Sequence, residues 1–434
     1  MTHFGIISAG ASTSHLNTIL PLGQALKRRG HPVTFFGVVD AELKVTQAGI
    51  AFYPIGQTEL PPGSAEAGAK QLGQLKGLAA LKFTIETFER HCRVNLKEMP
   101  AAMRTAQVEA LLIDQSAIEG GTIAEILEVP FITVCSAVML NREASIPPPF
   151  TSWQYRSSAW AQIRNRIGYR LLDQALMSIH SVIQHYRDLH HLPRYVHNRD
   201  FYSPLAQLSQ APAEFEFPRQ ELPSWFHFTG AYYSASSRTV VPFPDEQLTG
   251  QPLIYASLGT VMNRAIEIFY AIATACAAFD VQLVLSLGSS IGREKLPHLP
   301  GSPIVVKYAP QLELLQKAAL MITHAGMSST LEAIQAGVPM VAIPMVNDQP
   351  GIAARIAWTG AGEVVPLRQL TVPKLQTAIQ KVLTQPSYQQ NALRLQLAMQ
   401  RSGGIDRAVE VIEQAVTTRK PISRDAFNGS AQPC

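Results

Sequence analysis

Residues 320–356 hold polar side chains whose types and spacing could bind a phosphate group. An apolar segment ends at Thr323, and a short turn precedes the next helical pattern. The first residues of a helix have unsatisfied N–H groups and the positive end of the helix dipole, which favour an anion. Side chains of this turn add further donors. We therefore expect a phosphate site formed by His324, Gly326, Ser328 and Ser329.

Glu332 and a second polar cluster extend this site. Glu332 follows Ser328 by four residues and Ser329 by three, so the three side chains share one helix face. A carboxylate there can accept hydrogen bonds from two vicinal hydroxyls. Another apolar segment ends before Asp348 and Gln349, whose polar groups would surround a sugar. In open parallel sheets, ligands bind beyond the carboxyl ends of the strands, where both clusters fall.

The rest of the chain alternates apolar, strand-length segments with amphipathic, helix-length segments. This pattern is typical of parallel α/β sheets with crossover helices. The expected strands of a first set are THFGIIS, HPVTFFGV, IAFYPI, ALLIDQ and PFITVC, and those of a second set are PLIYASLG, QLVLSLG, PIVVKY, ALMITH, PMVAIP and EVVPL. Helices are expected to begin near Leu16, Ala41, Glu66 and Glu119, and the last ones to run from about Val372 to Thr417.

A segment rich in Ser, Pro and Gly, GAYYSASSRTVVPFPDEQLTG, separates the two sets of strands. It predicts a linker over 231–251, between an N-terminal domain over 1–230 and a C-terminal domain over 252–402. Residues 403–419 are expected to form a last helix. The tail over 420–434 is expected to be flexible.

Composition agrees with a large α/β protein. A length of 434 residues allows two or three domains at about 150 residues each. Charged residues make up 16% of the chain and hydrophobic residues 47%, and ordinary soluble domains have about 25% charged residues. Large buried sheets and an apolar ligand are therefore expected. The net charge of +4 is too small to indicate a nucleic-acid partner.

The cysteines and the apolar segments favour a cytoplasmic protein. The four cysteines lie far apart without CxxC spacing, which indicates neither a zinc site nor a disulfide framework. The N-terminus MTHFGIISAG lacks the basic and long apolar regions of a signal peptide. The longest apolar run, residues 268–279, is too short to span a bilayer. We expect a protein that is soluble or peripheral on the inner face of a membrane.

The polar clusters in 320–356 resemble the donor-binding signature of the inverting, UDP-sugar-dependent glycosyltransferases. This superfamily includes plant natural-product and bacterial macrolide enzymes. The resemblance implies a GT-B fold, in which two Rossmann-like domains with parallel sheets face each other across a cleft. A further implication is that the last helix, over 403–419, crosses back to the N-terminal domain. It also implies that His324 and Ser329 contact the diphosphate, that Glu332 holds the ribose, and that Asp348 and Gln349 bind the hexose. Plant members have Trp-Asn after the glycine, where this chain has Met-Ser.

The same family carries its general base in the turn after the first strand. Here that turn reads SAGASTSHLNTILPLGQAL, which lacks the GxGxxG fingerprint of a nicotinamide dehydrogenase and contains His15. Attack on an anomeric carbon needs a base that takes the proton of the acceptor hydroxyl, and histidine suits this task near neutral pH. A carboxylate that fixes the imidazole tautomer strengthens such a base. The resemblance places this carboxylate at Asp114, in ALLIDQS.

Two further turns resemble parts of the family's donor site. ASLGT matches the loop whose hydroxyl touches the diphosphate, which places that role on Thr260. KYAPQ matches the stretch whose aromatic ring stacks on uracil and whose glutamine reaches the base or ribose; these positions are Tyr308 and Gln311. The implied reaction uses UDP-glucose as co-substrate, with no metal and no cofactor.

Less common segments along nearly the whole chain are similar to the bacterial zeaxanthin glucosyltransferases. They include LPPGS at 60–64, LNRE at 140–143, YSPLAQLSQ at 202–210 and DQPGIAARI at 348–356. This similarity implies transfer of glucose to a terminal-ring hydroxyl of a carotenoid diol. Flavonoids, macrolides and other apolar alcohols stay open as acceptors. A UDP-sugar epimerase of the same two-domain architecture is the alternative reaction.

Residues 150–200 combine aromatic and aliphatic side chains with several arginines, so a basic amphipathic helix is predicted there. Such a helix could meet a membrane that holds the acceptor. The alternative is a helix that packs on the sheet with solvated arginines. Four nearby histidines lack carboxylate or cysteine partners at ligand spacing, so we expect surface residues and no metal site. These histidines are His185, His190, His191 and His197.

Overall fold

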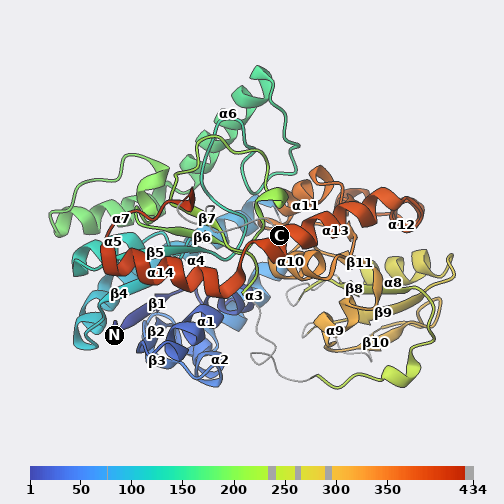
Figure 1. Cartoon of the computed structure of the whole chain (residues 1–434), viewed down its shortest axis with the longest axis horizontal. Helices are drawn as coiled ribbons and strands as arrows, with labels where there is room; N and C mark the ends of the chain where they lie inside the picture. Colours follow the sequence, from blue (N-terminus) through green and yellow to red (C-terminus); the bar gives the residue numbers. More distant parts are fainter. Residues whose placement is uncertain (76, 233–240, 260–264, 289–295, 426–434) are drawn as a thin grey trace, which may run out of the picture.

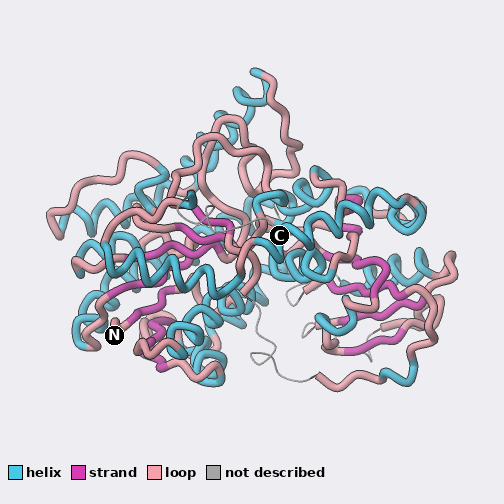
Figure 2. The backbone as a smooth tube through the Cα atoms, in the orientation of Figure 1, coloured by secondary structure: helices cyan, strands magenta, loops and turns pink. Residues whose placement is uncertain are grey.

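The computed structural model describes residues 1–75, 77–232, 241–259, 265–288 and 296–425. It contains two sheets of parallel strands, which lie side by side along the long axis of the molecule with helices packed around them (Figures 1 and 2). The expected α/β class with two Rossmann-like sheets is therefore confirmed.

The N-terminal sheet has seven strands in the order β3-β2-β1-β4-β5-β6-β7, and every neighbouring pair is parallel. The strands are β1 (Phe4–Ile7), β2 (Val33–Gly37), β3 (Ala51–Pro54), β4 (Ala110–Asp114), β5 (Phe131–Cys135), β6 (Gln207–Ser209) and β7 (Phe226–Phe228). The expected strands of the first set are all present. The short strands β6 and β7 were not predicted. Because β1, β4 and β5 are neighbours, their carboxyl ends lie next to one another.

The helices of this domain fill the connections between its strands. They are α1 (Thr13–Arg28), α2 (Glu42–Gln47), α3 (Ser64–Gln74), α4 (Gly77–Thr105), α5 (Gly120–Leu127), α6 (Ala159–Ala175) and α7 (Met177–Leu189). The helix expected near Glu66 is thus followed by the much longer α4.

The C-terminal sheet has six strands in the order β10-β9-β8-β11-β12-β13. They are β8 (Leu253–Ser257), β9 (Gln282–Ser286), β10 (Ile304–Val306), β11 (Ala318–Thr323), β12 (Met340–Ala342) and β13 (Gly362–Val364). Its helices are α8 (Ala265–Cys276), α9 (Gln311–Leu315), α10 (Met327–Ala336), α11 (Gln349–Trp358), α12 (Val372–Thr384) and α13 (Pro386–Arg401). All six expected strands are present. The buried strands β8 and β11 form the centre, so the turns after them face the same edge of the sheet.

The last helix, α14 (Gly404–Thr418), returns to the N-terminal domain and packs along α1 (Figure 1). Its buried side chains, including Val409 and Ile412, share one apolar core with Leu16 of α1. Glu413 on the same helix bonds Arg29 at 2.7 Å and His31 at 3.1 Å. The two domains are thus joined by the end of the chain as well as by the segment between the sheets.

The first part of the expected flexible tail is held against the N-terminal domain. The N–H groups of Ile422 and Arg424 donate to the backbone carbonyls of Leu205 and Ser224, at 2.9 and 2.8 Å. Ile422 is buried in the same core as α14. The remainder of the tail, from residue 426, lies outside the described residues, as do 233–240 of the expected linker.

No helix in the described ranges is long and apolar enough to cross a membrane. The same ranges contain no cluster of three or more His, Cys, Asp or Glu side chains that could hold a metal ion. The four histidines expected at the surface are exposed.

Candidate active site

The expected base and its carboxylate are in direct contact. His15 lies in the first turn of α1, after β1, and Asp114 is the last residue of the neighbouring strand β4. Nδ1 of His15 lies 2.6 Å from Oδ2 of Asp114. The His15 side chain is 16% exposed, whereas Asp114 is fully buried. A hydrogen bond at Nδ1 leaves Nε2 to take a proton, which is the arrangement that a general base requires.

Ser136, which was not predicted from the sequence, contacts both members of this pair. It follows β5, the strand beside β4, and its hydroxyl donates to Oδ1 of Asp114 at 2.8 Å. The same hydroxyl oxygen lies 2.8 Å from Nδ1 of His15. The N–H of Ser116 also donates to Oδ1, at 2.9 Å. The buried carboxylate is therefore held in one orientation by groups from three chain segments.

The charges of the pair determine both pKa values. Burial by itself lowers the pKa of His15, but the Asp114 carboxylate stabilises the imidazolium, and the net pKa is raised above its ordinary value. Burial also acts to raise the pKa of Asp114. The charge of His15 and the hydrogen bonds from His15, Ser116 and Ser136 outweigh burial, so that pKa is lowered. Asp114 is thus ionised at neutral pH, and His15 is a stronger base than a free histidine.

The turn after β11 carries the second expected histidine, His324, against two glycines. A methyl group at Gly326 would lie 2.5 Å from Nε2 of His324, and one at Gly259 would lie 2.9 Å from it. Both glycines are needed for the ring to fit. Ala325, between His324 and Gly326, has φ +62°, a left-handed conformation that is costly for a residue with a side chain. This turn places the N-terminus of α10 next to the carboxyl end of β11.

Within the described ranges, His324 contacts no carboxylate. Burial lowers its pKa to about 4, and a weaker interaction with the Ser257 backbone opposes this only in part. Its Nδ1 is buried and makes no hydrogen bond within the described residues. A neutral imidazole beside the N-terminus of a helix can donate a hydrogen bond to a phosphate without carrying a charge of its own.

Gln311, Ser329 and Glu332 lie together, as expected from their assignment to one donor site. Nε2 of Gln311 donates to Oε2 of Glu332 at 2.5 Å and to Oγ of Ser329 at 3.4 Å. The hydroxyl of Tyr255, at the centre of β8, donates to Oε1 of Gln311 at 3.0 Å. Glu332 is only 3% exposed. These bonds fix the side chains that are assigned to the ribose and the base.

The remaining donor candidates lie around this group. Tyr308 is 46% exposed, with Nζ of Lys307 5.7 Å from its ring centroid, so its ring is accessible for stacking. Ser328 lies in the first turn of α10, beside Ser329. Thr260 lies outside the described residues.

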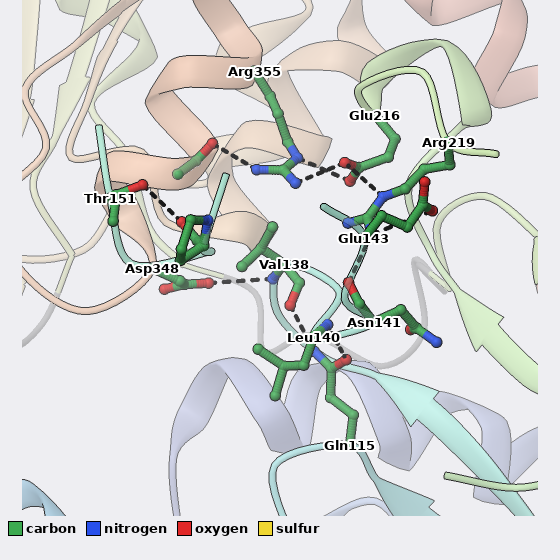
Figure 3. Close-up of polar contacts among 12 residues, drawn as sticks. Gln115, Val138, Leu140, Asn141, Glu143, Thr151, Glu216, Arg219, Asp348 and Arg355 are labelled. Carbon is green, nitrogen blue, oxygen red and sulfur yellow. Dashed lines mark hydrogen bonds and ion pairs between the residues drawn. The ribbon is translucent and has the colours of Figure 1, made fainter. Parts of the chain in front are cut away.

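Asp348 and Gln349 lie at the start of α11, where the two domains meet. Asp348 makes no capping bond to its own helix; its Oδ2 accepts from the N–H of Val138 in the N-terminal domain, at 3.3 Å (Figure 3). Burial raises its pKa, although Val138 and the charge of His15 act to lower it. Oε1 of Gln349 accepts from the N–H groups of Met345 and Val346, at 2.9 and 3.0 Å. Asp348, one of the two expected sugar residues, therefore interacts electrostatically with the expected base.

The segment over 136–149 connects the base to the donor residues. It begins at Ser136 and passes Val138, which is also bonded through its carbonyl to Nε2 of Gln115, the residue after Asp114. At its end the Pro149 carbonyl packs on Gly351, where a methyl group would lie 2.0 Å from the oxygen. Only glycine at 351 allows this backbone contact. Part of the N-terminal domain thus lies directly against the start of α11.

A buried ion network holds α11 against the N-terminal domain (Figure 3). Arg355 donates two bonds to Glu216, at 2.6 and 2.8 Å, and both side chains are almost fully buried. Arg219 contacts the same carboxylate at 3.4 Å and donates to the Asn141 carbonyl at 2.6 Å. Burial acts to raise the pKa of Glu216, but the charges of Arg355 and Arg219 outweigh it and lower that pKa. Neither Glu216 nor Arg355 was predicted from the sequence as a site residue.

Comparisons with known proteins identify the family of this chain. The sequence profile of the family described as UDP-glucoronosyl and UDP-glucosyl transferase matches residues 64–418. The zeaxanthin glucosyltransferase of Pantoea ananas is 32% identical over 425 residues, which are 97% of this chain and 98% of that protein. The zeaxanthin glucosyltransferase of Pseudescherichia vulneris is 29% identical and covers 98% of this chain and 100% of its own.

Solved structures confirm the expected GT-B fold. The glycosyltransferase of kitacinnamycin superposes with a TM-score of 0.76 at 21% identity, over 96% of this chain and 99% of that one. CalG4, the calicheamicin glycosyltransferase, superposes with a TM-score of 0.75 at 20% identity, over 97% and 100%. From the family profile and the relatives together, the chain belongs to the UDP-glucoronosyl and UDP-glucosyl transferase family, as a hexosyltransferase with the GT-B fold.

Proposed function

We propose that this enzyme transfers glucose from UDP-glucose to a hydroxyl of an apolar acceptor, namely zeaxanthin or a related hydroxy-carotenoid, with inversion at the anomeric carbon. The observation that carries the proposal is the 2.6 Å contact between His15 and the buried Asp114, within electrostatic range of Asp348. A donor site alone would only bind a nucleotide sugar. The base pair supplies the reaction.

In the proposed reaction, Nε2 of His15 takes the proton of the acceptor hydroxyl as its oxygen attacks the anomeric carbon. The bond between that carbon and the diphosphate oxygen breaks, and UDP leaves with the electron pair. Asp114 stabilises the imidazolium that forms. The N–H groups at the start of α10, together with His324 and Ser329, stabilise the charge that develops on the diphosphate. Thr260 is assigned to the same group.

The acceptor is proposed from the relatives. The two zeaxanthin glucosyltransferases named above match nearly the whole chain, including its acceptor domain. Flavonoids and macrolides stay alternatives, and epimerisation of the UDP-sugar is less well supported because that reaction has no acceptor for His15 to deprotonate.

The test is to incubate the purified protein with UDP-glucose and a panel of zeaxanthin, flavonoid and macrolide acceptors, and to identify products by mass spectrometry. We expect a glucosylated carotenoid. Glucosylation of a flavonoid but of no carotenoid would refute the proposed acceptor. A UDP-sugar isomer formed without any acceptor would indicate an epimerase instead. EDTA is expected to leave the rate unchanged, and a rate restored only by added magnesium would contradict the metal-free reaction.

The proposal includes peripheral contact with a membrane. A carotenoid diol is an apolar polyene that dissolves in lipid and hardly in water, so the enzyme has to take its acceptor from a bilayer. Contact between the enzyme and the bilayer surface would shorten the distance that the acceptor travels to the active site.

A further inference from the structure

Helix α6 exposes a continuous apolar stripe. Trp160, Ile163, Ile167 and Leu171 are spaced by three, four and four residues, which places them along one helix face. They are 71%, 47%, 49% and 61% exposed, in that order. Apolar side chains of this size are normally buried when they line up in this way. The stripe therefore lacks its own partner within the described chain.

The opposite face of α6 attaches the helix to the protein. Nδ2 of the buried Asn165 donates to the Ala144 carbonyl at 3.0 Å. A methyl group at Gly168 would lie 2.9 Å from both Pro148 and Trp153, so the helix packs closely on these residues. A helix turns about 100° per residue, which places this contact face away from the stripe. Figure 1 shows α6 projecting beyond both sheets. The helix thus rests on a loop, and the alternative of a helix packed on the sheet is not observed.

The charges beside the stripe are positive on both sides. Arg166 and Arg170 are exposed along one border. Arg164 lies along the other, with its guanidinium 4.7 Å from the Trp153 ring centroid. The one acidic residue of α6, Asp173, bonds Arg142 at 2.5 Å and so is already neutralised. The outward surface of the helix is therefore apolar in the middle and basic at its borders.

We propose that α6 is a membrane-docking helix, which inserts its apolar stripe at the boundary of lipid headgroups and acyl chains and places its arginines on anionic phosphates. Apolar burial and attraction to anionic lipid are the two interactions that hold an interfacial helix on a bilayer. A second copy of the chain is a poorer occupant, because pairing two such faces would bring arginine borders together.

Docking through α6 would place the reaction close to the lipid. The helix rests on Ala144, Pro148 and Trp153, in the stretch of chain that begins at Ser136 beside His15. The biological purpose of this docking rests on the proposed lipid-soluble acceptor, whereas the docking itself can be measured without any transfer reaction.

The test compares binding of the full chain to vesicles of mixed phosphatidylglycerol and phosphatidylcholine with binding to vesicles of phosphatidylcholine alone, by co-sedimentation. We expect binding to the anionic vesicles that weakens with added salt. The double substitution Ile163→Ser/Ile167→Ser is expected to lower the partition coefficient at least tenfold, because two aliphatic side chains leave the lipid. Arg166→Gln/Arg170→Gln is expected to lower it at least fivefold on anionic vesicles only.

The matched control is Leu393→Ser/Leu397→Ser on α13, where the two leucines are 43% and 50% exposed on the other domain. This variant is expected to bind vesicles like the wild type, and circular dichroism would verify that all variants fold. Wild-type protein that ignores anionic vesicles, or an α6 variant that binds as well as the control, would overturn the proposal. So would a wild-type dimer in sedimentation equilibrium that the α6 variant loses while vesicle binding persists. A failure to glucosylate any carotenoid in detergent would count against the proposed acceptor and leave the docking result intact.

Discussion

The two domains each place one histidine in a turn between a strand and a helix, but the surroundings of the two rings are opposite. His15 contacts a buried carboxylate, which raises its pKa against the effect of burial. His324 lies against Gly259 and Gly326, and burial lowers its pKa to about 4. The same residue type in the same kind of turn is thus suited to accept a proton in one domain and to stay neutral near pH 7 in the other.

This difference matches two separate tasks in the proposed reaction, proton transfer in the N-terminal domain and donor binding in the C-terminal domain. In the proposed reaction, the base for the acceptor hydroxyl must bind a proton, and Asp114 stabilises the charged form of His15. In the proposed donor site, a contact to the diphosphate has only to stay in place, and His324 has a close steric fit against Gly259 and Gly326. Substitutions in the two turns would change the environment of one histidine at a time.

The largest effect is expected for His15→Ala. Loss of a general base costs about 10²- to 10⁴-fold in rate, so kcat should fall by that factor while the affinity for UDP stays unchanged. Steady-state kinetics and calorimetric UDP titration would measure the two quantities. Turnover near the wild-type rate would show that another group takes the proton.

Asp114→Asn is expected to lower kcat/KM about a hundredfold and to move its pH dependence. The base works only when neutral, so kcat/KM of the wild type should rise with pH through the raised pKa of His15. Without the Asp114 carboxylate, burial lowers the pKa of His15 and only the charge of Asp348 opposes it, so the acidic limb should move to lower pH. An acidic limb that stays in place would mean that Asp114 does not control the proton affinity of His15.

His324 should make the folded state less stable in acid. In the unfolded chain this histidine takes a proton near its ordinary pKa of 6.5, whereas the folded protein resists protonation down to about 4. The unfolded state therefore binds more protons between these values, and stability falls as pH falls through this window, by up to about 3 kcal/mol. Urea unfolding of wild type and His324→Gln at several pH values would measure this, and an equal loss in both would contradict it.

Gly326→Ala is expected to raise KM for UDP-glucose about tenfold, about 1.4 kcal/mol, with a smaller effect on kcat. The new methyl group would lie 2.5 Å from Nε2 of His324 and push the ring from its place. Gly68→Ala, in α3, meets no atom within 4 Å and is the control. A similar KM for both variants would show that the fit of His324 is not needed for donor binding.

The grouping of the donor-site candidates could be predicted because most of them belong to one stretch of chain. His324 and Gly326 lie in the turn after one strand, and Ser329 and Glu332 follow on one face of the next helix, so spacing alone places the four residues near one another. The C-terminal strands were predicted for a related reason, since their long apolar runs are buried on both faces of a parallel sheet.

The residues between the domains could not be predicted in this way. Glu216 and Arg355 are 139 positions apart, and their pairing depends on how two independent sheets are oriented. Ser136 could in principle have been predicted as a site residue, because it directly follows an expected strand. Its contact with His15, however, depends on the strand order β1-β4-β5. Strands β6 and β7 have three residues each, too few for a recognisable alternation.

The backbone contact of Pro149 on Gly351 bears on how such enzymes can be recombined. Chimeras that exchange the donor half of one glycosyltransferase for that of another assume that each half carries its own site. Here the start of α11, in the donor half, contacts two backbone groups of the acceptor half. They are the carbonyl of Pro149 and the N–H of Val138. A working hybrid of this chain would have to take the loop over 136–149 and α11 from the same parent enzyme, because the two segments contact each other across the domain boundary.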